Sequence, residues 1–216
     1  VAKNAKDDTN HNLIVIADPQ ISERNELPEL AKHSDDIAEF VKGMDGDYTF
    51  GLCLGDIVGW DHSIYPEYNK IMSKAGFEYR YVIGNHDMTN WGRSFETSMK
   101  NYGDMYGPAW YSFNVGDVHY VVMNDNFYVG RDYFYIGYLD ERQLSWLENE
   151  LADAKTSGKP CFILNHYLVY GRNGSRSYAD FNIADQNDRL TEILETSGVR
   201  TFYFCGHSHY GVSDDS

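Results

Sequence analysis

The sequence is poor in cysteine and has no long apolar run. Its three cysteines, Cys53, Cys161 and Cys205, are an odd number and leave no complete disulfide framework. Each lies in an apolar, strand-like run, so we expect buried free thiols, not zinc ligands, which normally come as close pairs. A membrane-spanning helix needs roughly 20 consecutive apolar residues, and no stretch of the sequence approaches that length. These absences argue against a disulfide-stapled scaffold and against a membrane segment in this chain.

Positive charge is also scarce. The chain has 18 Lys and Arg residues against 33 Asp and Glu residues, which gives a net charge of −15. Nucleic acids and anionic membranes are bound through basic patches, so this balance argues against both as general partners. A small anionic substrate remains compatible with it, because bound metal ions can reverse the local field. With 216 residues, of which 42% are apolar, the chain suits one domain with a sizeable core.

Strand-like and helix-like segments alternate along the chain. We expect residues 1–11 to be a disordered lead-in and residues 12–216 to form a single domain. Short apolar runs predict strands at 12–17, 49–54, 79–83, 161–164 and 201–205, with a hairpin at 110–124 around Gly116-Asp117. Periodic apolar residues predict helices at 34–43, with Ser34 as the cap, and at 64–74, 140–155 and 185–196. The alternation indicates an α/β layered fold in which the hairpin adds antiparallel strands.

Polar side chains follow five of the predicted strands at the point where each strand ends. These ends read Asp18-Pro19-Gln20, Gly55-Asp56, Gly84-Asn85-His86-Asp87, Asn165-His166 and Gly206-His207-Ser208-His209. Because sites in such sheets form at the carboxyl ends of the strands, we expect these groups to share one rim. Carboxylate, amide and imidazole groups in one place make a metal site of mixed oxygen and nitrogen ligands. The three glycines are expected to permit the sharp turn that aims the next side chain into the cavity.

In this order, the five blocks resemble the motif series of the calcineurin-like metallophosphoesterase superfamily, from about residue 13 to residue 209. The resemblance implies a four-layer α/β/β/α sandwich of two mixed sheets flanked by helices, the metallo-dependent phosphatase fold. It also implies a dinuclear metal-dependent hydrolase that cleaves a phosphate mono- or diester by in-line attack of a metal-bridging hydroxide.

The resemblance further assigns roles to single residues. One metal would be held by Asp18, Gln20 and His209, the other by Asn85, His166 and His207, and Asp56 would bridge the two. His86 would stabilise or protonate the leaving-group oxygen, with Asp87 orienting its ring. Many family members have His where this chain has Gln20. The harder amide oxygen favours Mn²⁺, Mg²⁺ or Fe over Zn²⁺, so we expect two divalent ions, with manganese favoured.

Each of these residues also has a more ordinary interpretation, which is capping or turn formation at a strand end. The set as a whole favours ligation, because buried polar groups need partners and a metal supplies them. Two alternatives stay open: Gln20 as a non-ligand, and His86 as a further ligand or a structural hydrogen-bonding group. His62, in the loop after Asp56, is a further candidate for lining the pocket, whereas His119 is expected to be packed in the core.

Two segments supply candidate substrate contacts. Tyr128, Tyr133 and Tyr135 lie in an aromatic-rich loop that would stack on the organic group of a substrate or pack against another domain. Arg172 and Arg176 lie in a Gly/Asn/Ser-rich loop and would grip a phosphate oxygen or simply be solvated. A small organic or nucleotide phosphate therefore fits better than duplex DNA. The alternatives are a phosphodiesterase or nuclease, which should show a basic cleft, and a binding scaffold, which should lack some ligands.

The chain begins with Val and stops at Ser216, shortly after the last block. Family domains usually continue beyond that block with more sheet, so we expect a catalytic piece of a longer protein. It resembles bacterial envelope proteins in which such a domain lies between accessory β-domains. That resemblance would place the protein in the periplasm or cell envelope.

Overall fold

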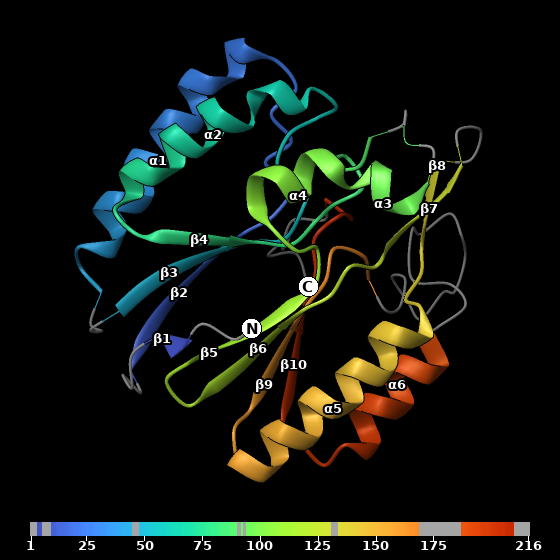
Figure 1. The fold of residues 1–216 in the computed structure, drawn as a ribbon. Coiled ribbons are helices and arrows are strands. Elements are labelled where there is room, and N and C mark those ends of the chain that lie inside the picture. Colours follow the sequence, from blue (N-terminus) through green and yellow to red (C-terminus); the bar gives the residue numbers. More distant parts are fainter. Residues whose placement is uncertain are drawn as a thin grey trace, which may run out of the picture.

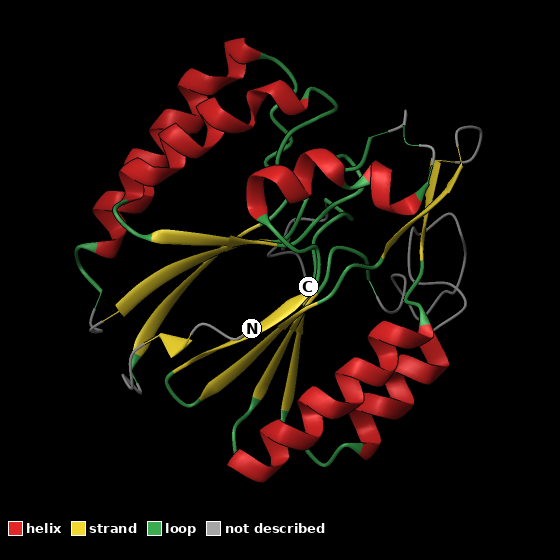
Figure 2. Ribbon diagram, viewed as in Figure 1, coloured by secondary structure: helices red, strands yellow, loops and turns green. Residues whose placement is uncertain are grey.

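The structure is a computed structural model that describes residues 4–5, 10–44, 48–89, 92, 94–130, 134–168 and 187–209. Two β-sheets face each other across an apolar interior, and helices cover the outer side of each (Figures 1 and 2). The α/β/β/α layering expected from the resemblance is therefore confirmed. None of the described helices is long and apolar enough to cross a membrane.

The first sheet contains β2 (His11–Ile16), β3 (Tyr48–Cys53) and β4 (Glu78–Tyr81), and its strands are parallel. The second sheet has the order β1-β5-β6-β9-β10 and is mixed. Its strands are β1 (Asn4–Ala5), β5 (Tyr111–Val115), β6 (Val118–Val122), β9 (Cys161–Leu164) and β10 (Thr201–Phe204). Only the β5–β6 pair in it is antiparallel, which is the predicted hairpin. All described strands that carry a motif block therefore end at the same rim.

The helices cover the outer faces of these sheets. α1 (Leu27–Val41) and α2 (Tyr65–Met72) lie on the first sheet, and α5 (Glu141–Ser157) and α6 (Asn187–Thr196) lie on the second (Figure 1). The interior between the sheets is aromatic-rich: Phe50, Leu52 and Val82 from one side meet Phe113, Tyr120 and Leu164 from the other. Burial of this apolar surface, at about 25 cal/mol per Å², holds the two halves together.

Several elements differ from their predicted form. Ser34 does not cap a helix: it lies inside α1, fully buried, and its hydroxyl donates to the Ile71 carbonyl at 3.0 Å. The helix starts earlier because Pro28 pre-sets its first turn. The expected disordered lead-in contains paired backbone, since β1 joins the edge of β5 and His11 begins β2. The three thiols are free as predicted, with Cys53 and Cys161 buried and Cys205 partly so.

Two short helices and a hairpin were not predicted from the sequence. The short helices α3 (Phe95–Ser98) and α4 (Lys100–Tyr106) follow the GNHD block. The aromatic-rich loop is in fact a hairpin of β7 (Asn126–Gly130) and β8 (Phe134–Gly137), with a bulge between Tyr128 and Gly130. In Figure 1 the two helices and the hairpin lie at the rim where the motif-bearing strands end, so they border the candidate site.

Candidate metal centre

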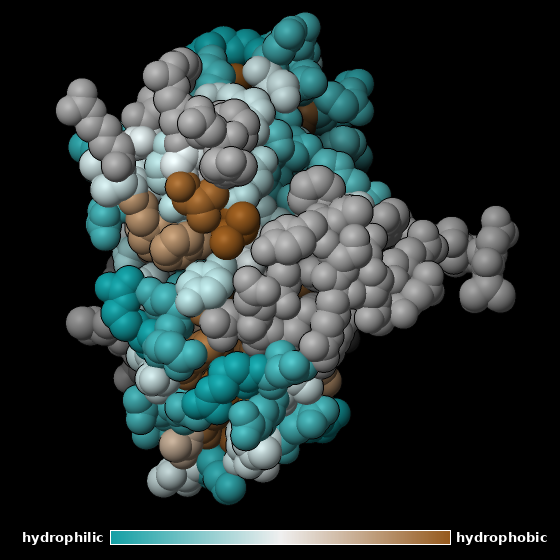
Figure 3. Space-filling model, turned by 90° about the vertical axis from the view of Figure 1, so that its right-hand side faces the viewer, coloured by the Kyte–Doolittle hydropathy of each residue, from teal (hydrophilic) through white to brown (hydrophobic). Residues whose placement is uncertain are grey.

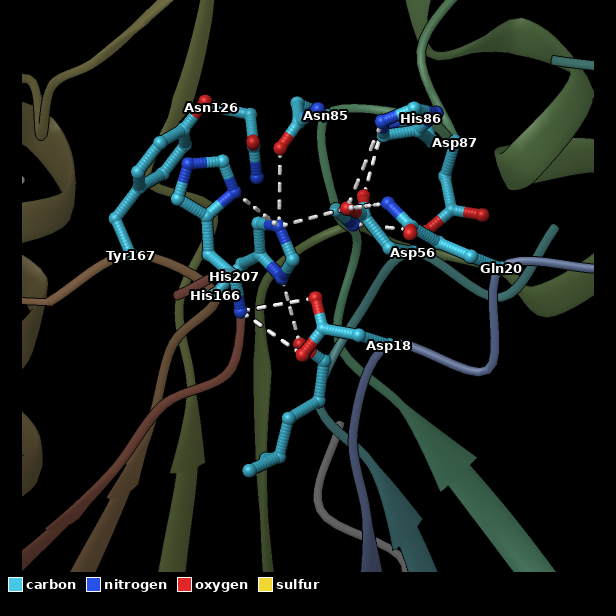
Figure 4. A network of polar contacts seen from close by, with 12 residues as sticks. Asp18, Gln20, Asp56, Asn85, His86, Asp87, Asn126, His166, Tyr167 and His207 are labelled. Carbon is cyan, nitrogen blue, oxygen red and sulfur yellow. Dashed lines mark hydrogen bonds and ion pairs between the residues drawn. The ribbon is translucent and has the colours of Figure 1, made fainter. Parts of the chain in front are cut away.

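The predicted ligands come together at the ends of five strands from both sheets. Asp18, Gln20, Asp56 and Asn85 follow strands of the first sheet, and His166, His207 and His209 follow strands of the second. Figure 4 shows the ring of His166 in the middle, with Asn85, Asp56 and His207 turned toward it. Within each of two groups, Asp56-His166-His207 and Asp18-Asp56-His209, the potential ligand atoms lie within 4.8 Å of one another. Asp56 belongs to both groups, as a bridging carboxylate must.

The group around His166 is electron-rich. Its Nε2 lies 3.0 Å from Asn85 Oδ1, 3.2 Å from His207 Nδ1 and 3.3 Å from Asp56 Oδ2. On the other side of the ring, Nδ1 lies 2.8 Å from the Leu54 carbonyl oxygen, which can only accept a hydrogen bond. Nδ1 therefore carries a hydrogen, and in the neutral form of the ring the lone pair is at Nε2. Lone pairs from imidazole, amide and carboxylate thus converge, and a cation fits this set of donors.

The second group is more open. His209 Nε2 lies 3.5 Å from Asp18 Oδ1, and the His209 side chain is 53% exposed. The Gln20 side chain reaches the group, but its Nε2 donates to Asp56 Oδ2 at 3.0 Å. In this orientation the amide nitrogen faces the carboxylate, so Gln20 can act as an oxygen ligand only if its amide is turned over.

Five of the seven expected ligands have backbone in the left-handed region. The φ angles are 50° for Asp18, 42° for Gln20, 52° for Asp56, 66° for His207 and 50° for His209. Among the described residues, these five are also the complete set of non-glycine residues with positive φ. Such backbone costs on the order of 1–3 kcal/mol per residue and persists where the surroundings impose it, typically at functional sites. The strain is thus concentrated in the predicted ligand set.

The three glycines of the motif blocks were expected to permit a sharp turn, but only one of them has the backbone conformation that requires glycine. Gly55 has φ +93°, which is the freedom predicted for it. A Cβ on Gly84 would lie 2.1 Å from the Asp56 backbone nitrogen, and one on Gly206 would lie 2.6 Å from Asp18 Oδ2. These two glycines are therefore required for space and not for an unusual turn, because the carboxylates of the site approach their backbones closely.

Buried charges of opposite sign shape the acid–base properties of the centre. Burial favours the neutral form of Asp56, but the attraction of His166 outweighs it and lowers the pKa of Asp56 to about 2. Burial lowers the pKa of His166, but Asp56, Asp18 and Asp125 more than offset this and raise it to about 9. For His207, burial together with the proximity of His166 lowers the pKa to about 4. The carboxylates thus favour a positive charge at His166, and a cation bound at Nε2 would supply that charge in place of the proton.

His86 lies beside these groups without belonging to either of them. Its backbone N–H donates to Asp56 Oδ1 at 2.8 Å, and its ring Nε2 lies 4.0 Å from Asp56 Oδ2. Burial lowers the pKa of the ring, opposed by Asp56 and by the nearby backbone of Gly59. Its side chain is 24% exposed, so a substrate in solution can reach it.

The expected role of Asp87 is wrong. Its carboxylate does not contact the His86 ring. It accepts hydrogen bonds from the Gly84 N–H at 2.9 Å, the Ile57 N–H at 3.2 Å and the Tyr65 hydroxyl at 3.0 Å. Burial and the nearby Asp56 raise the pKa of Asp87 to about 7. Asp87 therefore ties the loop after β3 to the loop after β4, and the His86 backbone is instead held through its carbonyl, 2.9 Å from His62 Nε2.

Two important residues were missed from the sequence. Asp125 is fully buried and accepts from Asn165 Nδ2 at 3.2 Å, the His166 N–H at 3.3 Å and the Tyr167 N–H at 2.8 Å. It fixes the turn that carries His166. Trp60, in the loop after Asp56, is 47% exposed, and its ring centroid lies 4.3 Å from that of His86.

The candidate substrate contacts divide into three kinds. Tyr135 is at the site, where its hydroxyl accepts from Asn85 Nδ2 at 3.1 Å. Tyr128 is 7% exposed, donates to the Gly92 carbonyl and belongs to the core, so it is not a stacking surface. Tyr133, Arg172 and Arg176 lie outside the described residues. His119 is buried between Asn114 and Glu150, as expected of a core histidine.

Comparisons with known proteins agree with this geometry. The crystal structure of a dimetal phosphatase from Danio rerio matches with a TM-score of 0.59 and 13% sequence identity, over 90% of this chain and 87% of that chain. This likeness shows that the fold is of the metallo-dependent phosphatase class. A family model described as calcineurin-like phosphoesterase matches residues 11–211, and the chain therefore belongs to that family of metal-dependent phosphoesterases. A search of curated proteins finds no significant match.

Proposed function

We propose that the protein hydrolyses phosphate esters with two divalent cations held side by side at the rim. Asp18, Gln20 and His209 would hold one cation, and Asn85, His166 and His207 the other, with Asp56 shared. The observation that carries this proposal is the membership of Asp56 in both groups of potential ligands, each within 4.8 Å. When bound, such a pair lowers the pKa of a water molecule so that it can attack phosphorus, and neutralises charge on the phosphoryl oxygens.

His86 is the proposed proton donor to the leaving group. In hydrolysis an oxygen from water bonds to phosphorus, the bond from phosphorus to the ester oxygen breaks, and that oxygen takes up a proton. The ring nitrogen of His86 is 4.0 Å from the shared carboxylate, which places it next to a bound phosphate. A histidine there suits proton donation near neutral pH.

The donor set favours manganese. Carboxylate and amide oxygens from Asp18, Asp56, Asn85 and Gln20 make the pair of sites richer in oxygen than an all-imidazole centre. Oxygen ligands suit Mn²⁺ and Mg²⁺, whereas Zn²⁺ is well served by imidazole. We therefore propose that Mn²⁺ supports the highest activity.

The shared carboxylate provides the sharpest test. Asp56→Asn keeps the size of the side chain but removes the charge that both cations would share. Since loss of an outer partner of a metal ligand alone costs roughly 10–100-fold, we expect activity on mono- and diesters to fall by more than roughly a hundredfold. Metal analysis should find fewer than two ions per chain.

Asp153→Asn, an exposed carboxylate on α5, is the matched control and should keep both activity and metal. An Asp56→Asn protein that retains full activity would refute the proposal. Assays on p-nitrophenyl phosphate and on bis(p-nitrophenyl) phosphate, each with Mn²⁺, would show whether monoesters or diesters are preferred.

A further inference from the structure

An exposed aromatic ring stands next to the proposed proton donor. The Trp60 ring is 4.3 Å from the His86 ring, centroid to centroid, with an interplanar angle of 37°. The Tyr135 ring is stacked on the Trp60 ring, with a centroid distance of 6.2 Å and an interplanar angle of 27°. Nearly half of Trp60 is nevertheless exposed, at 47%. A large ring left open to water beside a reacting group points to a binding surface.

The position of Trp60 is fixed by its surroundings. Its loop is tied to the segment after β2, because Val58 forms a bridge with Ile21 and the Gly59 N–H donates to the Ile21 carbonyl at 2.9 Å. Tyr135 is in turn held by its hydrogen bond with Asn85. The backbone that carries Trp60 is therefore held in place, which lowers the entropic cost of binding a ligand there.

The neighbours of the Trp60 ring determine which part of a substrate it would contact. The Asp56 carboxylate and the Trp60 ring both lie close to the His86 ring: His86 Nε2 is 4.0 Å from Asp56 Oδ2, and the indole is 4.3 Å from the imidazole, centroid to centroid. A phosphate at the shared carboxylate, with its ester oxygen at His86, brings the first ring of the alcohol against Trp60. Stacking on an indole stabilises a bound flat aromatic group, whereas a puckered aliphatic group gains little binding energy from it.

We infer that Trp60 is a leaving-group platform that selects phosphate esters whose alcohol carries a planar aromatic ring close to the ester oxygen. This inference rests on the proposed phosphoester hydrolysis and names its substrate class. Aryl-methyl esters belong to the class, whereas simple alkyl and sugar phosphates do not.

The test compares benzyl phosphate with cyclohexylmethyl phosphate. Both leaving groups are primary alcohols of similar size, so the two esters differ mainly in the flatness and aromaticity of the ring. We expect the Mn²⁺-loaded protein to show a kcat/KM at least roughly fivefold higher for the benzyl ester, as base–aromatic stacking predicts. Trp60→Leu should remove this preference by lowering the benzyl value alone, and Trp60→Tyr should retain part of it.

The matched control is Trp110→Leu, because Trp110 is also exposed, at 38%, but packs edge-to-face against Trp146 of α5, a helix that carries no proposed ligand. It should leave the preference unchanged. Equal values for the two esters in the wild type, or a preference that survives Trp60→Leu, would overturn the inference. If Trp60 only shielded His86 from water, Trp60→Leu would lower both values equally, and the platform would again be refuted.

Binding separates this inference from the hydrolysis itself. Benzylphosphonate and cyclohexylmethylphosphonate cannot be hydrolysed, and calorimetry on the Mn²⁺-loaded protein measures their affinities directly. Tighter binding of benzylphosphonate that is lost in Trp60→Leu supports the platform even if neither ester is cleaved, in which case only the proposed hydrolysis fails. Equal affinities would overturn the platform, whatever the activity.

Discussion

His86 and His166 both follow sheet strands, yet their ring nitrogens are used differently. His166 is fully buried, donates through Nδ1 to Leu54 and directs Nε2 at three other donors of electron pairs. His86 is partly open, and its buried Nδ1 makes no hydrogen bond of normal geometry. The first arrangement suits a metal ligand and the second suits a group that exchanges a proton with a substrate.

Replacing His86 by Asn should therefore separate catalysis from metal binding. We expect kcat to fall by roughly 10²–10⁴-fold, the usual contribution of a positioned acid, while the metal content stays unchanged. Steady-state kinetics and metal analysis check this. His33→Asn, on the exposed face of α1, is the control. Loss of one metal ion in the His86 variant would reassign this residue as a ligand.

Gln20 allows a test of metal preference at a single position. Its amide lies beside Asp56 but presents nitrogen in the structure. Gln20→His replaces a hard oxygen donor with imidazole, so the ratio of activity with Zn²⁺ to activity with Mn²⁺ should rise in stripped and reloaded protein. Asn25→His, exposed in the same loop region, should not change the ratio. An unchanged ratio in the Gln20 variant would indicate that this side chain does not contact the metal.

At the scale of elements, the site is held by loops that approach one another closely. Gly84, after β4, comes so near the loop after β3 that a Cβ would lie 2.2 Å from Asp56 Oδ1. Asp87 joins the same two loops by hydrogen bonds to the backbone of Ile57 and Gly84. The carboxylate of Asp56 is therefore positioned by the contact between two strand ends, and not by its own strand alone.

Gly84→Ala should disturb this contact. The added methyl group must push Asp56 away, which we expect to cost roughly 1–3 kcal/mol of stability and to weaken metal binding at least tenfold, roughly as loss of an outer partner does. Urea unfolding and a metal titration measure the two effects. Gly103→Ala, where a Cβ in α4 meets nothing within 4 Å, should bind metal normally. A Gly84→Ala protein with normal metal affinity would contradict the argument.

The strands, and the convergence of the candidate ligands at one rim, could be predicted because both depend on local sequence. Apolar runs mark the strands, and parallel strands necessarily bring their carboxyl ends to one rim. The start of α1 was missed because Ser34 resembles a cap, whereas its hydroxyl binds the carbonyl of Ile71 on a neighbouring helix. Asp125 and Trp60 could not be found because a single Asp or Trp in a loop gives no local signal. Their roles depend on where those loops lie in the folded chain.

At the scale of the whole molecule, the proposed ligands join two sheets whose interface is otherwise mainly apolar. Asp18, Asp56 and Asn85 come from one sheet and His166 and His207 from the other. Figure 3 shows hydrophilic residues at the top and bottom of this side of the molecule and a group of hydrophobic residues between them. The net charge of the chain is −15. Cations at the rim would both neutralise local negative charge and connect the two halves.

Metal loading should therefore stabilise the fold. A ligand at about 100 times its Kd contributes about 2.7 kcal/mol to the free energy of unfolding, which corresponds to a rise in Tm of roughly 5–10 °C for a chain of this size. Thermal unfolding with Mn²⁺ and after chelation measures the shift. Asp56→Asn should lose most of it. An equal shift in that variant would mean that Mn²⁺ acts elsewhere on the protein.

The left-handed backbone of five proposed ligands has a consequence for engineering. A residue with a side chain pays a conformational cost for a positive φ angle, and glycine does not. Glycine would therefore remove this cost at Asp18, Gln20, Asp56, His207 or His209. Selection of variants for thermal stability alone would therefore favour glycine at these positions, and the proposed metal-binding side chains would be lost. Thermal stability and catalytic activity are in conflict at these positions. Stabilising substitutions in this protein should therefore be sought elsewhere.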